Sequence, residues 1–147
     1  MEALKTIRNT PVSELMQKDV VTIDGSQNVA QAIQLMKTNR VASLVVLPRN
    51  EDDAYGILTV RDILGKVIDP GENIYRDIWN TQVLDIMNKP VFSVDPTMRV
   101  KYALRMMNKL GVRRLVVLRG SELLGIISEI EIFHAVEELP AVAQVAL

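Results

Sequence analysis

The sequence contains no cysteine, a single histidine and few aromatic residues among its 147 positions. The lack of cysteine excludes disulfides, thiolate zinc sites and a cysteine nucleophile. His134 stands alone in the stretch IEIFHAVEEL, so we expect it at the surface or in an interface rather than in a catalytic group. Aromatic residues make up 4% of the chain, so aliphatic side chains must form most of the core.

An excess of charge of one sign and a long apolar run are also missing. The chain has 17 Lys and Arg against 18 Asp and Glu and no long basic tract, so it lacks the electrostatic pattern of a nucleic-acid-binding protein. No stretch approaches the roughly 20 apolar residues that span a bilayer. The N-terminal MEALKTIRNTP lacks the apolar core of a signal peptide. We therefore expect a soluble, cytoplasmic protein without nucleic-acid or membrane partners.

What the sequence does contain is an internal repeat. The stretch VSELMQKDVVTIDGSQNVAQAIQLMKTNRVASLVVL, from Val12, aligns without gaps with VLDIMNKPVFSVDPTMRVKYALRMMNKLGVRRLVVL, from Val83, and 13 of the 36 positions are identical. The loop that follows is two residues shorter in the second copy, after which GILTVRDIL, from Gly56, aligns with GIISEIEIF, from Gly125. A duplication of roughly 60 residues is the simplest explanation.

Each copy has the same order of expected elements. A brief strand and a turn precede an amphipathic helix, and two β-branched and leucine-rich strands then lead into a last helix. The amphipathic helices follow from apolar residues at i, i+3, i+4 and i+7, namely Val29, Ala32, Ile33 and Met36, and Val100, Ala103, Leu104 and Met107. The predicted fold class is α+β, with two β-α-β-β-α repeats related by a pseudo-twofold axis and small sheets packed between helices.

The repeats divide the chain into five segments. These are an N-terminal segment (1–11), the first repeat (12–68), a linker (69–82), the second repeat (83–137) and a C-terminal tail (138–147). The linker is polar and contains a Pro-Gly stop, and we expect its Tyr75 and Trp79 to pack on the body of the protein. The tail, ELPAVAQVAL, can dock on its own body or on a partner, and the sequence leaves both possibilities open.

Both copies end in a glycine, two apolar residues, a hydroxyl residue and, three positions later, an acid. Thr59 with Asp62, and Ser128 with Glu131, can be capping boxes worth about 1 kcal/mol each, and the second pair matches that motif better. The functional alternative is a ligand site. The glycine lets a ligand or a backbone come close, free N–H groups at a strand-to-helix junction favour an anion, and a carboxylate can accept hydrogen bonds from a ribose diol.

With these duplicated motifs the sequence resembles the tandem cystathionine-β-synthase (CBS) domain pair, or Bateman module, from about Val12 to Val136. The resemblance implies a regulatory, non-enzymatic module with an adenosyl ligand in a cleft between the repeats. Candidate ligands are AMP, ADP and ATP, with magnesium as an accompanying ion, and also NAD and S-adenosylmethionine. No obligatory cofactor is implied. Modules of this family commonly form flat dimers through their helices, so a homodimer and a regulated partner protein of unknown identity are also implied.

The resemblance also assigns residues to two clefts. The first cleft would use Ile57, Thr59 and Asp62, with Val91 and Phe92 beside the adenine and Arg113 and Arg114 on phosphate. The second would use Ile126, Ser128 and Glu131, with Val20, Val21 and Thr22 on the adenine side. We expect the first cleft to bind more tightly, because Ala42 and Ser43 replace the two arginines in the other repeat and the longer Glu131 moves its carboxylate outward.

Alternatives remain at the level of the sequence. The two arginines could be exposed charges on a strand edge that discourage aggregation, and Val91 and Phe92 are expected in the core under every interpretation. The whole module could serve oligomerisation alone, with vestigial clefts. A small nucleotide-processing enzyme is the least favoured alternative, because the chain has neither a Walker-type phosphate loop nor a Gly-x-Ser-x-Gly motif.

Overall fold

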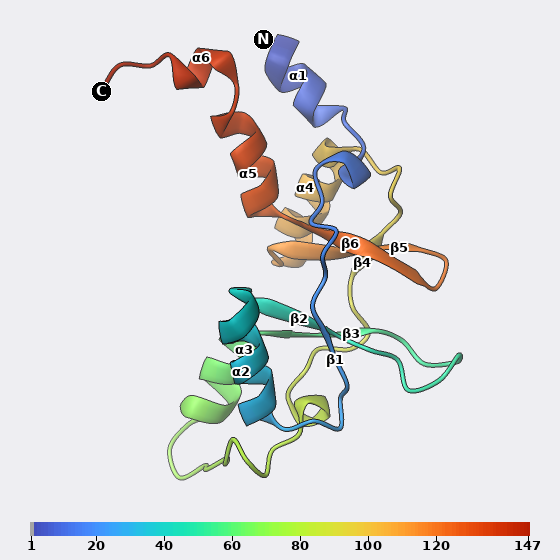
Figure 1. Cartoon of the computed structure of the whole chain (residues 1–147), viewed down its shortest axis with the longest axis vertical. Coiled ribbons are helices and arrows are strands. Elements are labelled where there is room, and N and C mark those ends of the chain that lie inside the picture. The colour runs from blue at the N-terminus through green and yellow to red at the C-terminus, as the bar shows by residue number, and fades with distance from the viewer. Residues whose placement is uncertain (1) are drawn as a thin grey trace. The chain divides into compact units, whose positions relative to one another are not determined.

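The computed structural model describes residues 2–147, and the chain divides into two compact units. We call Val21–Val91 the repeat-1 unit, and Met1–Val20 together with Phe92–Leu147 the repeat-2 unit. Each unit contains a three-stranded sheet with flanking helices (Figure 1). The α+β class and the duplicated layout predicted from the sequence are therefore confirmed.

In the repeat-1 unit the order of the strands in the sheet is β1-β2-β3, with β1 parallel to β2 and β2 antiparallel to β3. Its elements are β1 (Thr22–Ile23), α2 (Val29–Asn39), β2 (Ser43–Val46), β3 (Gly56–Thr59), α3 (Val60–Ile63), the π-helical turn η2 (Leu64–Ile68) and the 3₁₀ turn η3 (Val83–Asp85).

The repeat-2 unit has the same sheet in the order β4-β5-β6, again with one parallel and one antiparallel pair. Its elements are α1 (Glu2–Arg8), the 3₁₀ turn η1 (Val12–Glu14), β4 (Ser93–Val94), α4 (Val100–Leu110), β5 (Arg114–Arg119), β6 (Glu122–Ser128), α5 (Glu129–Glu137) and α6 (Pro140–Ala143). Helices α1 and α6 lie in the terminal segments, for which the repeat pattern predicted no element.

Local signals set the ends of the two amphipathic helices. Helix α2 begins with a capping box, in which Asn28 Oδ1 accepts from the Gln31 N–H at 2.8 Å and Gln31 Oε1 accepts from the Asn28 N–H at 2.9 Å. Helix α4 ends at Leu110 and is capped by Gly111, whose φ of 69° lies in the left-handed region that glycine adopts without steric cost. Of the four apolar positions predicted on each helix, three are buried, while Ile33 and Leu104 are each 36% exposed.

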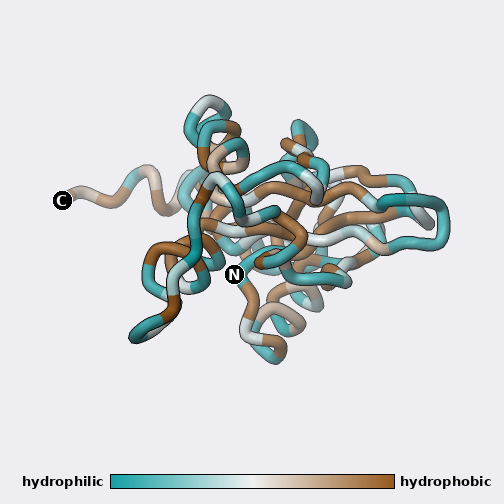
Figure 2. The backbone as a smooth tube through the Cα atoms, turned by 90° about the horizontal axis from the view of Figure 1, so that it is seen from below, coloured by the Kyte–Doolittle hydropathy of each residue, from teal (hydrophilic) through white to brown (hydrophobic). Residues whose placement is uncertain are grey.

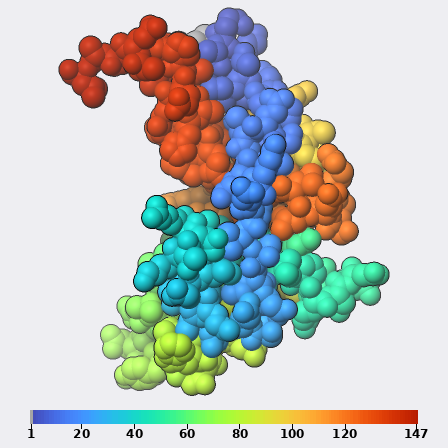
Figure 3. Space-filling model, in the orientation of Figure 1, coloured from blue at the N-terminus to red at the C-terminus, as the bar shows by residue number. Residues whose placement is uncertain are grey.

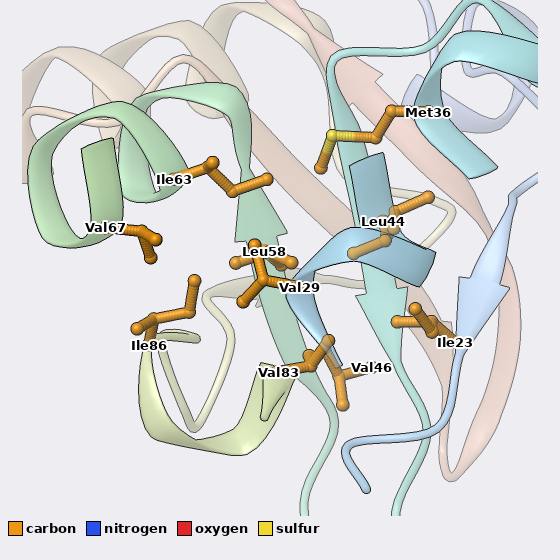
Figure 4. Packing of buried hydrophobic residues seen from close by; sticks show 11 residues of the cluster. Ile23, Val29, Met36, Leu44, Val46, Leu58, Ile63, Val67, Val83 and Ile86 are labelled. Carbon is orange, nitrogen blue, oxygen red and sulfur yellow. The ribbon is translucent and has the colours of Figure 1, made fainter. Parts of the chain in front are cut away.

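The cores show that the compact units differ from the sequence repeats. The repeat-1 core combines side chains of all its main elements with two residues that precede the second repeat's strand (Figure 4): Ile23, Val29, Met36, Leu44, Val46, Leu58, Ile63, Val67, Val83 and Ile86. Conversely, Val12 of the first repeat lies in the repeat-2 core. The strands that supply these cores are coloured hydrophobic along the chain, whereas their hairpin loops are hydrophilic (Figure 2). The first segment of each sequence repeat therefore belongs to the compact unit that the rest of the other repeat forms.

The expectation for the aromatic residues of the linker is wrong. Tyr75 is 90% exposed and Trp79 is 67% exposed. The linker is part of the repeat-1 unit and packs there through Ile78, which lies against the core, and the buried Thr81 instead. The carbonyl oxygens of these two residues accept hydrogen bonds from the first two N–H groups of α2, at 3.0 and 2.9 Å. Because these backbone bonds already hold the linker, the large side chains beside them can point to solvent.

The C-terminal tail is exposed in its own unit. No residue from Glu138 to Leu147 is buried, and α6 with the residues after it extends from the end of α5 (Figures 1 and 3). No helix among residues 2–147 combines the length and the apolar character needed to cross a bilayer.

Candidate functional site

The Thr59–Asp62 junction in the repeat-1 unit forms a complete capping box. Thr59 is the N-cap of α3, and its Oγ1 accepts from the Asp62 N–H at 3.2 Å. One carboxylate oxygen, Asp62 Oδ2, accepts from the Thr59 N–H at 2.8 Å and from the Thr59 hydroxyl at 2.9 Å. The Asp62 residue is only 9% exposed. The structural interpretation of this motif is therefore confirmed, and the carboxylate is held in one orientation.

The other oxygen of Asp62 is held by two side chains. Asp62 Oδ1 accepts from Asn88 Nδ2 at 3.0 Å and lies 3.3 Å from Lys66 Nζ. Lys66 Nζ also donates to the carbonyl oxygen of Ile86 at 2.9 Å. A carboxylate has about four acceptor positions, so three hydrogen bonds and the ion pair with Lys66 occupy Asp62 without any ligand. A ligand hydroxyl that binds Asp62 must replace one of them.

Asn88 reaches this carboxylate because its backbone pairs with β3. The N–H of each of Ile57 and Asn88 donates to the carbonyl of the other, both at 2.9 Å. Gly56 permits this approach: a Cβ atom there would lie 3.2 Å from the Asn88 carbonyl oxygen and 2.8 Å from Met87 Sδ. Of the two roles predicted for this glycine, the close approach of a backbone is the one that the structure supports.

The loop before β3 is tied to the same segment by an ion pair. Asp53 lies in the longer loop of the first repeat, and its two carboxylate oxygens are 2.6 and 2.7 Å from Lys89 Nζ. The Lys89 ammonium and the backbone N–H of Arg49 hold the pKa of Asp53 well below its usual range. Two residues further on, the Val91 N–H donates to the Tyr55 carbonyl at 3.1 Å. Val91 is thereby fixed beside the start of β3.

The matching junction in the repeat-2 unit has the same backbone pairing but different side-chain bonds. Gln17, which corresponds to Asn88, exchanges backbone hydrogen bonds with Ile126 at 2.8 and 3.0 Å. The Ser128 hydroxyl donates to the Glu131 carboxylate, and its oxygen accepts from no N–H of the first turn of α5. The expectation that this copy is the better capping box is wrong, because the hydrogen bond that the Thr59 hydroxyl accepts from the first turn of its helix has no counterpart at Ser128. The position that corresponds to Lys66 is Ala135.

The expectation of free N–H groups at these junctions is wrong for four of these groups. In the repeat-1 unit the Thr59 and Asp62 N–H groups take part in the capping box, and the Val60 N–H donates to the Ala42 carbonyl at 3.0 Å. In the repeat-2 unit the Glu129 N–H donates to the Arg113 carbonyl at 3.0 Å. An anion would have to compete with these bonds, so the side chains are better candidates for ligand contacts than the helix ends.

The two predicted phosphate ligands belong to the repeat-2 unit. Arg113 is exposed and precedes β5, while Arg114 is the first residue of β5 and lies opposite Ser128 in the register of β5 and β6. Strand β5 is the middle strand of its sheet. The alternative that these arginines protect a strand edge is therefore wrong. Their contribution to the predicted first cleft stays a prediction.

The residues predicted on the adenine side divide between the two units. Phe92 is 48% exposed, so its expected place in the core is wrong, while Val91 is half-buried. The Phe92 carbonyl accepts from the Val116 N–H at 3.1 Å, so the backbone is bound to β5 while the ring faces outward. Val20 belongs to the repeat-2 unit, and Val21 with Thr22 belongs to the repeat-1 unit, all three half-buried.

Sequence reasoning missed Asn88 and Lys66. Lys66 follows Asp62 by four residues, a spacing at which opposite charges meet on a helix, so this signal was available. Asn88 is 26 positions from Asp62 in the sequence and carries no local signal. In the part of the chain that the structure describes, no group of three or more His, Asp and Glu side chains is arranged to hold a metal ion.

Comparison with known proteins agrees with this architecture. The family model described as "CBS domain" matches residues 12–69 and, separately, residues 83–138. The chain belongs to the CBS domain family. An uncharacterized protein of Methanocaldococcus jannaschii is 29% identical to this CBS domain pair over 97% of the chain. The chain spans only part of the first relatives it matches, covering 36% of that protein and 60% of a relative from Methanopyrus kandleri.

Solved structures of CBS domain proteins have the same fold. The hexameric CBS-CP12 protein from bloom-forming cyanobacteria is 41% identical, with a TM-score of 0.79 over 84% of this chain and 66% of that protein. The CBS domain of a bacterial CNNM/CorC family Mg²⁺ transporter, solved in complex with ATP, has a TM-score of 0.74 at 17% identity and covers 92% of each chain. At that identity the likeness concerns the fold alone.

Proposed function

We propose that this CBS domain pair is a ligand-sensing regulatory module that binds an adenine nucleotide or another adenosyl ligand. The observation that carries the proposal is Asp62, a largely buried carboxylate whose orientation is fixed through Oδ2. Its Oδ1 accepts a hydrogen bond from the Asn88 side chain, which can move aside for a ribose hydroxyl group. The ATP complex of the transporter's CBS domain supports the proposal, because that protein binds an adenine nucleotide with the same fold.

Thermal unfolding with and without AMP, ATP, NAD and S-adenosylmethionine tests this function. A ligand at 100 times its dissociation constant adds about 2.7 kcal/mol of stability, which should raise the melting temperature by at least about 5 °C in a domain of this size. Mg²⁺ should be present in one series, since we propose it only as a companion of the phosphates. No shift with any of the four would favour the oligomerisation alternative, and product formation from ATP would favour the enzyme.

We also propose that the protein forms a homodimer through its last helices. In the repeat-1 unit Val60, Leu64 and Ile68 are exposed at spacings of four residues along α3 and η2. In the repeat-2 unit Ile130 and Phe133 are exposed on α5, which corresponds to α3 in the duplication. Apolar surface of this kind is stabilised by cover from another protein surface. The hexameric state of the CBS-CP12 protein supports self-association as a property of relatives.

A further inference from the structure

We propose that Asn88 is an internal competitor of the ligand: its side-chain amide occupies Asp62 Oδ1 in the free protein and leaves when a ligand diol binds there. This inference rests on the proposed function and adds a residue that sets the affinity. Its basis is the full set of groups that contact Asp62. Among them, the hydrogen bond from the Asn88 side-chain amide is 3.0 Å long and lies within the repeat-1 unit.

Of the four groups that contact the Asp62 carboxylate, through three hydrogen bonds and one ion pair, three are unsuited to leaving. The Thr59 N–H and hydroxyl belong to the capping box that starts α3, so their loss would open the helix end. Lys66 carries a positive charge and is held at both Asp62 Oδ1 and the Ile86 carbonyl. Its removal would leave a largely buried carboxylate without its cation, and such a loss is more costly than that of one neutral donor.

Asn88 can leave without disturbing the fold. It is an exposed residue, and its backbone is fixed separately by the two hydrogen bonds to Ile57. A rotation of its side chain therefore breaks one hydrogen bond and leaves the backbone pair with β3 intact. In solvent the freed amide regains hydrogen bonds to water, so the cost of its departure is the net value of a single bond.

The repeat-2 unit supplies a matched position. Gln17 has the same backbone pairing, with Ile126, as Asn88 has with Ile57. The acid of that unit, Glu131, takes its hydrogen bond from Ser128. Replacement of Gln17 therefore removes a side-chain amide at the equivalent place without freeing an acceptor on Asp62.

The test is calorimetric titration of the full chain with AMP, comparing the native protein with Asn88→Ala and Gln17→Ala. We expect Asn88→Ala to bind AMP on the order of fivefold more tightly, the factor that corresponds to about 1 kcal/mol for one hydrogen bond. Gln17→Ala should leave the affinity unchanged. In ¹⁵N spectra of the native protein, the Asn88 side-chain amide signals should move toward the positions of solvent-exposed amides as AMP is added.

Weaker or unchanged affinity in Asn88→Ala, with binding retained by the native protein, would overturn this inference and leave the proposed function intact. If Asn88→Ala binds none of the adenosyl probes at millimolar concentration, and the native protein binds none either, both proposals fail together. Because Asn88→Ala keeps the backbone pair with Ile57, it should fold, and its circular dichroism spectrum checks this. Asn88→Ser, with a side chain too short to reach Asp62 as the amide does, should reproduce the gain.

Discussion

Replacement of Gly125 by alanine tests how closely Met16 and Gln17, which belong to the first repeat, lie against β6. A Cβ atom at this position would lie 2.7 Å from the Gln17 carbonyl oxygen and 2.7 Å from Met16 Sδ. The sulfur can move, but the carbonyl accepts from the Ile126 N–H at 3.0 Å and belongs to a backbone pair. Relief of the clash weakens both bonds of that pair, at about 1 kcal/mol each, and adds strain from overpacking. We expect Gly125→Ala to lower the free energy of unfolding by about 2–4 kcal/mol.

Two other glycines calibrate this result. A Cβ atom on Gly65 would meet nothing within 4 Å, so Gly65→Ala should gain about 0.5–1 kcal/mol through helix propensity. Gly56→Ala should fall between, because its closest contact, Met87 Sδ at 2.8 Å, is flexible and the Asn88 carbonyl is 3.2 Å away. Urea unfolding followed by circular dichroism measures all three. A Gly125→Ala variant whose free energy of unfolding equals or exceeds that of the native protein would refute the reasoning.

Three further outcomes are expected. Asn28→Ala should cost about 1 kcal/mol of stability, seen in urea unfolding, because the capping box with Gln31 is lost; no loss would contradict the assigned cap. Lys89 lowers the pKa of Asp53 in the folded protein. The carboxylate therefore stabilises the fold at pH values above its ordinary pKa of 3.8, and this stabilisation is lost progressively as the pH falls below 3.8. The difference in melting temperature between the native protein and Asp53→Asn should therefore shrink from pH 5 to pH 2, and a constant difference would contradict it. Leu64→Glu should convert the proposed homodimer to monomer in light scattering, and an unchanged mass would exclude this helix face as the interface.

The elements of this fold could be predicted because the signals that define them are local and occur twice. The helical spacing of Val29, Ala32 and Met36 predicted their burial, and the repeat in the second copy supported the assignment. Strand pairing followed from short loops between apolar runs. The prediction failed for Ile33 because the buried face of α2 includes only three of the four apolar positions in the pattern.

The exchange of the first segments between the units could not be predicted from the sequence. It depends on backbone pairs such as Ile57 with Asn88, and a backbone hydrogen bond imposes little on residue type. The same limit applies to Asn88 and Asp62, which meet only because that pairing forms. At Ser128 the motif was recognised, but the Ser128 oxygen accepts no hydrogen bond from the first turn of α5, so the capping box is incomplete.

The candidate residues were predictable only as far as the family pattern extends. Thr59 and Asp62 are adjacent in the fold because three positions separate them in the chain. Phe92 was expected in the core because of its apolar side chain, yet its backbone bond to Val116 leaves the ring exposed. Burial of a single aromatic residue depends on which helices and strands pack against it, and a short stretch of sequence does not reveal these neighbours.

The central claim is that Asp62 binds the hydroxyl groups of an adenosyl ligand. Calorimetric titration of AMP into the native protein, Asp62→Ala and Glu131→Ala tests it most directly. Loss of hydrogen bonds to a charged acceptor costs about 1.5–3 kcal/mol, so Asp62→Ala should bind AMP at least about tenfold more weakly, while Glu131→Ala should change the affinity of the tightest site much less. Equal affinity in the native protein and Asp62→Ala, with stability reduced in the variant, would show that this carboxylate serves only to cap its helix.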